Sequence, residues 1–202
     1  RLSAERISKE LLKLLQADDP RAAVGLMREA GVLPIILPGD LDYARFAEMC
    51  AIDADPELRL SALLPDDSDA VAATAERLRL SNAQRDRLVC AAEAEPSVTL
   101  DMDPREARGA IYRLGARAFD DRVKRAWAAA PEHSEAARRL LQLAGSWTAP
   151  KFPLGGAEAM AAGLSGPAVG KALKAVEDWW VAEDFPAGGA LQKLHEVAGE
   201  GT

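Results

Sequence analysis

The chain has 202 residues, 49% of them hydrophobic and 28% charged, which is enough for one large domain or two modest ones. This composition excludes a disordered chain, and no apolar run approaches the ~18–20 residues that span a bilayer. We therefore expect a cytoplasmic protein without membrane contact. The net charge of -7 argues against a nonspecific nucleic-acid coat.

Helical periodicity begins at once. In the opening RLSAERISKELLKLL, apolar side chains recur on one face and charged side chains on the other. Asp19-Pro20 predicts the start of a second helix that ends at Gly31. Two prolines in residues 32–40 predict extended backbone, and Asp40 is expected to cap a helix through residues 43–50. Pro56 opens another short helix that ends near residue 64.

The middle of the chain continues the helical pattern. Residues 71–80 are predicted to be helical, and Ser81 with Gln84 forms a capping box for the next helix. Asp103-Pro104 repeats a cap followed by a proline, and that helix reaches a break or close-packing point at Gly115.

The last part contains the clearest linker. A helix from Pro131 stops before Trp147, and TAPKFPLGG (residues 148–156) then places two prolines and two glycines in nine residues. No stretch alternates with a period of two, so we predict an all-α fold. We divide it into residues 1–65, 66–146 and 147–202: an entry segment, a helical body and a small tail resembling a helix-turn-helix.

Positive charge concentrates in residues 104–139, which hold nine Arg and Lys against five Asp and Glu. We call this segment the basic island. Because binding of phosphate follows the local field and not the total charge, we predict an RNA-binding face here. Its predicted centre comprises Arg105, Arg108, Arg113 and Arg117.

A turn rich in glycine follows in GLSGPAVGKALKAVEDWW (residues 163–180). Pro167 suits the first position of a helix, and Gly166 and Gly170 leave the N-terminal end of that helix open to an anion. Lys151, Lys171 and Lys174 lie nearby in the sequence. The turn is either a phosphate site or a tight hairpin that needs glycine for close packing. Trp180 is in register with Val169, Leu173 and Val176, which favours a core anchor over a platform for bases.

Signals for catalysis are weak. His133 and His195 have no neighbours that suggest a triad or metal site, and capping by Asp103 explains the Asp101-Met102-Asp103 pair. Cys50 and Cys90 suit buried thiols in a reducing compartment. No phosphate-binding loop, H-E-x-x-H or C-x-x-C motif is present. We expect no catalytic residue and no metal site in these residues.

Four segments together resemble one family: RLSAERISKELLKLL, GVLPIILP, LRLSNAQRDRL and GLSGPAVGKALKAVEDWW. In this order they resemble the bacterial tRNA nucleotidyltransferase/poly(A) polymerase family, whose CCA-adding members rebuild the 3′ end of tRNA. The family's catalytic head carries a glycine-serine motif, a DxD metal pair and a V-R-D triplet, and its neck carries E-D-x-x-R. None of these is present, so the chain resembles the region downstream: the end of the neck, the body and the tail.

The resemblance implies tRNA and the chain's own catalytic head as partners. It also implies Mg²⁺ and CTP or ATP as cofactors of the full-length enzyme, with none in this part. Arg1, Ser3, Glu5, Arg6 and Glu10 match the neck helix, which implies a structural role for Glu5, Arg6 and Glu10 against the head.

We thus predict an RNA-binding C-terminal region that positions the RNA 3′ end and is inactive without its head. The alternatives are a helical scaffold for protein interactions that has lost RNA binding, and a helix-hairpin-helix DNA binder.

Overall fold

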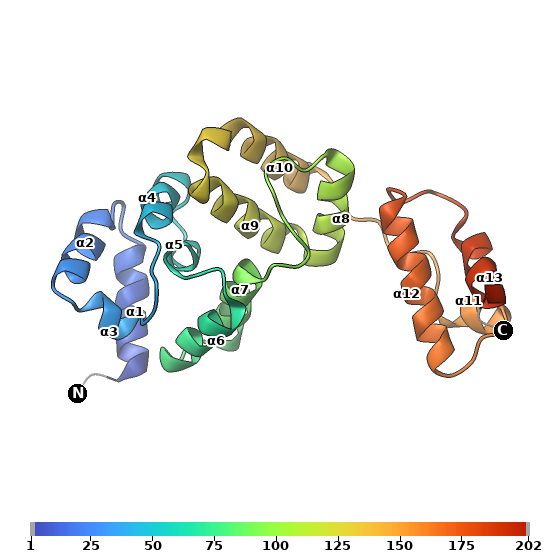
Figure 1. The fold of residues 1–202 in the computed structure, drawn as a ribbon, viewed down its shortest axis with the longest axis horizontal. Helices are drawn as coiled ribbons and strands as arrows, with labels where there is room; N and C mark the ends of the chain where they lie inside the picture. The colour runs from blue at the N-terminus through green and yellow to red at the C-terminus, as the bar shows by residue number, and fades with distance from the viewer. Residues whose placement is uncertain (1–2, 201–202) are drawn as a thin grey trace.

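The computed structural model describes residues 3–200, and these residues form an elongated all-α structure without a β-strand (Figure 1). None of the described helices is long and apolar enough to cross a membrane. The α-helices are α1 (Ala4–Leu15), α2 (Arg21–Glu29), α3 (Leu33–Ile36), α4 (Tyr43–Ile52), α5 (Pro56–Leu63), α6 (Ser68–Arg77), α7 (Asn82–Ala92), α8 (Pro104–Leu114), α9 (Ala116–Ala129), α10 (Ser134–Ser146), α11 (Gly156–Ala161), α12 (Pro167–Ala182) and α13 (Ala190–Glu200), with a 3-10 turn, η1 (Pro131–His133).

Helices α1 to α7 share one hydrophobic core. Its buried side chains extend from Leu11 and Leu15 in α1, through Leu60 and Leu63 in α5, to Ala92 at the end of α7. The expected division between residues 65 and 66 therefore lies inside a single core. A smaller cluster, in which Ala128 of α9 packs with residues of α4 and α5, continues this core into the body.

A second core joins α8, α9 and α10, and a third joins α11, α12 and α13. The segment after α10 connects them, and the two groups of helices follow one another along the long axis in Figure 1. Trp147 packs against the second core and Phe152 against the third, so the change of core falls between these two residues.

Several local predictions are confirmed. Ser81 and Gln84 form the predicted capping box for α7, and Asp103 is the predicted cap of α8; the structure adds Glu106, which completes a second capping box there. Gly115, with φ of +81°, separates α8 from α9 in a conformation that few other residues adopt. Pro167 is the first residue of α12.

The predicted extended backbone at residues 32–40 is wrong in part, because Leu33–Ile36 form the short helix α3. Pro34 is tolerated because the N–H groups of a first helical turn have no partner within the helix. The cap of α4 is Asp42, whose carboxylate accepts from Arg45 N, and not Asp40.

Candidate nucleic-acid interface

Three of the four arginines predicted to centre the RNA face are engaged by the tail. Arg108 forms a two-pronged ion pair with Asp184, at 2.7 Å for its Nε, and Arg113 pairs with Asp178 at 3.0 Å. Arg105 donates to the carbonyl of Ala182. The acidic residues at the end of α12 therefore neutralise these arginines, so α8 does not present the row of free cations that the spacing suggested. That these arginines contact RNA stays a prediction.

Much of the remaining basic island is internal. Arg122 and Arg125 are buried, at 5% and 6% exposure, and Lys124 pairs with Asp53 at 2.9 Å. Arg125 shares Asp66 with Arg45, and burial lowers the pKa of Arg125 to about 10, with the neighbouring Arg45 as a further cause. The local excess of positive charge in the sequence thus serves largely to join helices.

An aromatic cluster completes the contact between α8 and the tail. Trp180 is buried, as the helical register predicted, and its Nε1 donates to the carbonyl of Pro186. Tyr112 stacks edge-on against Trp180 and donates its hydroxyl to Glu177. Burial and this carboxylate raise the pKa of Tyr112 to about 12. A Cβ at Gly109 would lie 3.3 Å from Val181, so α8 and α12 approach closely there.

The glycine turn between α11 and α12 is exposed, and Gly166 has a φ of +56°. Added Cβ atoms at Gly166 and Gly170 would meet nothing within 4 Å, so close packing does not require glycine at either position. The turn offers fewer free N–H groups than predicted. Pro167 has none, and the N–H of Val169 donates to the carbonyl of Gly166.

The lysines near this turn differ in their pairing. Lys174 pairs with Asp178 at 2.5 Å, whereas Lys151 and Lys171 are exposed and form no ion pair within residues 3–200. Arg117, in the first turn of α9, is likewise exposed without an ion pair in this range. Three of the nine predicted RNA-binding residues therefore carry an unpaired cation.

Helix α1 carries further unpaired cations that the sequence analysis did not assign to RNA. Ser3 caps this helix, and Glu5 pairs with Arg79 at 2.8 Å. Lys9 and Lys13, one turn apart, are exposed and have no ion-pair partner among the described residues. The lack of carboxylate partners is a signal visible only in the structure.

Arg6 and Glu10, which are four residues apart on α1, form no ion pair among the described residues. Arg1 lies outside the described residues.

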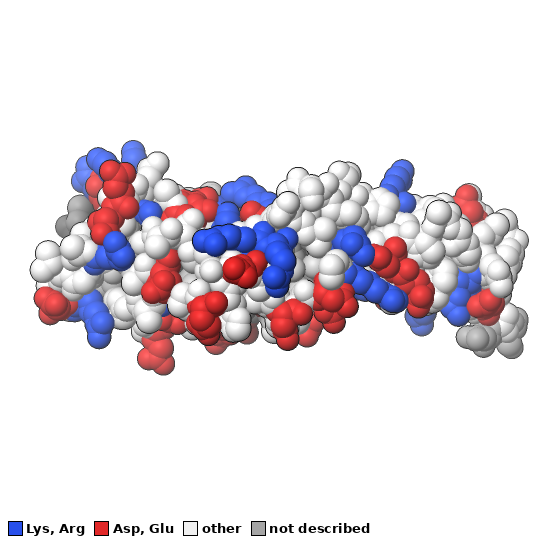
Figure 2. All heavy atoms as spheres, turned by 90° about the horizontal axis from the view of Figure 1, so that it is seen from above, with Lys and Arg blue, Asp and Glu red and all other residues white. Residues whose placement is uncertain are grey.

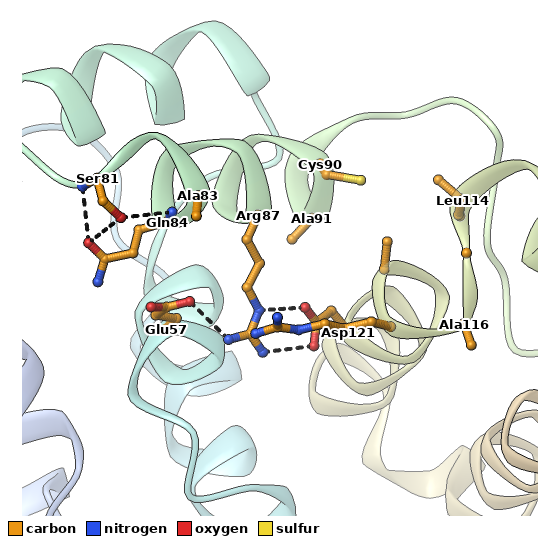
Figure 3. A pocket seen from close by; sticks show the side chains of 13 residues that line it. Glu57, Ser81, Ala83, Gln84, Arg87, Cys90, Ala91, Leu114, Ala116 and Asp121 are labelled. Atoms are coloured by element: carbon orange, nitrogen blue, oxygen red, sulfur yellow. Dashed lines mark hydrogen bonds and ion pairs between the residues drawn. The ribbon is translucent and has the colours of Figure 1, made fainter.

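A cavity of about 820 Å³ lies between α7, α5 and the start of α9 (Figure 3). Arg87 extends from α7 and donates to Asp121 on α9 at 2.7 Å and to Glu57 on α5 at 3.0 Å. The same guanidinium also binds Asp55 at 2.8 Å. One cation faces three carboxylates, so this wall of the cavity repels phosphate. Arg117, at the start of α9, also lines the cavity.

The charged side chains are dispersed across the face seen in Figure 2, where Lys and Arg alternate with Asp and Glu and no continuous basic band runs along the molecule. Any RNA contacts on this face would therefore involve small separate groups of Lys and Arg and not one long basic surface. Within the described residues, no three His, Cys, Asp or Glu side chains are grouped to hold a metal ion. Cys50 and Cys90 are half-buried free thiols, and burial raises the pKa of Cys50.

Two comparisons with known proteins bear on this surface. Residues 1–41 match the model of a family described as "Probable RNA and SrmB- binding site of polymerase A". This match indicates an RNA-binding region of the poly(A) polymerase kind at α1 to α3.

A protein of Rhodospirillum rubrum described as "Uncharacterized 28 kDa protein in petA 5'region" is 41% identical over 88 residues. The alignment covers 38% of this chain and 34% of the relative, so the chain spans about a third of the length of the curated relative it matches.

Proposed function

We propose that this chain is the RNA-binding region of a nucleotidyltransferase that adds CCA or poly(A) to RNA 3′ ends. It grips the phosphate backbone of tRNA and positions the 3′ end for a catalytic head outside these 202 residues. Nucleotidyl transfer requires the 3′ hydroxyl to lie in line with the α-phosphate, so accurate positioning contributes to the rate. Mg²⁺ and the nucleotide would be held by the head.

The observation that carries this proposal is the coincidence of the matched residues 1–41 with the unpaired lysines of α1. Lys9 and Lys13 stand one turn apart, and phosphates recur along RNA at intervals that neighbouring cations on a helix can follow. Lys151 and Lys171 supply a second group of cations in the tail. Phosphate contacts of this kind position RNA without reading its bases.

Replacing both lysines in the variant Lys9→Gln/Lys13→Gln should weaken tRNA binding roughly tenfold, because two phosphates lose their cations. The slope of log affinity against log salt should become shallower by about 1.4–1.8. Filter binding at several salt concentrations measures both quantities. Lys193→Gln is the matched control, since Lys193 already pairs with Glu196 at 3.1 Å and should change little. Equal affinities for the double variant and wild type would refute a role for α1 in binding RNA.

The glycine turn allows a second test. Gly170 lies in the first turns of α12 and faces open space, so Gly170→Asp should fold normally and place a carboxylate beside any bound phosphate. We expect a loss of tRNA affinity and a salt slope shallower by about one contact. Gly170→Ala adds the Cβ without the charge and should bind as wild type does. If the aspartate and alanine variants bind tRNA equally well, the turn is only a hairpin.

A further inference from the structure

An apolar groove of about 420 Å³ runs between α1 and the α2–α3 segment. Five of its seven lining residues are apolar: Ile7, Leu11, Leu14, Met27 and Ile36. Arg6 and Glu10 of α1 are the two charged lining residues. A groove of this composition offers RNA few hydrogen-bond donors, and Glu10 repels phosphate.

An exposed apolar ridge adjoins the groove. Leu26 is 66% exposed, Ile35 is 69% exposed and Val32 is 42% exposed. Leu26 directly precedes Met27 in α2, and Ile35 directly precedes Ile36 in α3, so the ridge lies beside the groove. Among the described residues, these are three of the five large hydrophobic side chains that are exposed. Such a concentration at one end of the molecule is typical of a surface that binds a protein.

The two charged residues of this groove have opposite signs, so the groove of one copy is complementary in charge to the groove of a second copy. Arg6 and Glu10 lie one turn apart on α1, both line the groove, and neither forms an ion pair within residues 3–200. A two-fold axis between two antiparallel α1 helices would place Arg6 of each copy against Glu10 of the other. The same axis would bring the ridge of each copy to the groove of its neighbour, as an isologous interface requires.

We propose that this groove and ridge form a two-fold interface with a second copy of this chain. The interface buries the exposed apolar side chains of α2 and α3 and forms two symmetric Arg6–Glu10 pairs. Lys13 is three residues from Glu10 on the same helix, so the interface adjoins the two lysines, and its test therefore uses no RNA.

A charge swap tests the proposal by sedimentation equilibrium without RNA. Wild type should associate to a dimer. Arg6→Glu and Glu10→Arg should each weaken the dimer roughly tenfold, because each places like charges together twice in a symmetric interface. The double variant Arg6→Glu/Glu10→Arg should restore association, because it re-forms both pairs with the charges exchanged. Circular dichroism checks that each variant is folded.

Ile35→Glu provides a second test, since it places a carboxylate in the apolar contact and should abolish association. Ile35 is largely exposed, so this variant should keep its fold. The matched control is Met160→Glu, because Met160 is 62% exposed at the opposite end of the molecule and should leave the dimer intact. A wild type that stays monomeric at every concentration overturns the proposal and leaves the groove to a different partner. A dimer that survives Ile35→Glu, or a swapped double variant that stays dissociated, also overturns it.

Discussion

Replacing Arg87 by methionine should lower the free energy of unfolding by about 3–5 kcal/mol, as expected when one partner of a buried ion pair is removed. Arg87 is 15% exposed and joins α7 to α5 and α9 through Glu57, Asp55 and Asp121. Asp121 is only 7% exposed, so the variant would leave this carboxyl group without its partner in a site that water barely reaches. Urea unfolding followed by circular dichroism measures the change.

The control is Arg85→Met, on the same helix. Arg85 pairs with Asp86 at 2.9 Å, but both side chains are exposed, so this variant should lose less than about 1 kcal/mol. Similar losses for the two variants would mean that burial does not determine the importance of the Arg87 network.

The free energy of unfolding should depend differently on pH in wild type and in the Arg87→Met variant. Burial raises the pKa of Asp55, but Arg87 and the N–H groups of Leu58 and Glu57 outweigh burial and hold the pKa below its ordinary value. Wild type therefore loses this stabilisation as the pH falls below about 4. Without Arg87, only the N–H groups of Leu58 and Glu57 still oppose the effect of burial on the pKa of Asp55, so the variant has less of this stabilisation to lose in acid. The difference in stability between the two proteins should therefore narrow as the pH falls below about 4.

The sequence predicts the helices because their signals are local. The capping box of Ser81 and Gln84 spans four residues, and so does that of Asp103 and Glu106. The prediction of extended backbone at Pro34 is wrong because proline occurs both in the first turn of a helix and in extended segments, and the sequence does not distinguish the two.

The candidate site is less predictable, because its pairings are distant in sequence. Arg108 pairs with Asp184, which lies 76 residues later in the sequence, and no local sequence pattern around either residue predicts this pair. From the sequence alone, Arg125 is expected to be exposed, as most arginines are. In the structure it is buried and donates to backbone carbonyls. From the sequence, the positive charge of the basic island predicts an RNA-binding face; in the structure, most of this charge pairs with groups elsewhere in the chain. The unpaired lysines of α1 emerged only once their neighbours were placed.

Arg59 illustrates this internal use of arginine most strongly. It is 2% exposed, and within the described residues its guanidinium donates to backbone carbonyls: those of Leu15 and Ala17 at the end of α1, and those of Cys50 and Asp53 at the end of α4. The last carbonyls of a helix have no partner within it, so one side chain of α5 satisfies two helix ends together. Arg59 thereby fixes α1, with Lys9 and Lys13, to the rest of the protein.

Arg59→Met should consequently lower the free energy of unfolding by about 4 kcal/mol, since four carbonyls each lose a donor at roughly 1 kcal/mol. Arg59→Lys should recover only part of this, because one ammonium group cannot reproduce the fork of donors. Arg77→Met is the matched control, since Arg77 is exposed and donates to a single carbonyl, that of Ile35. Hydrogen exchange should quicken most in α1 of the Arg59→Met protein, and tRNA affinity should fall with it. A variant as stable as Arg77→Met, with α1 still protected, would show that apolar packing alone holds this helix in place.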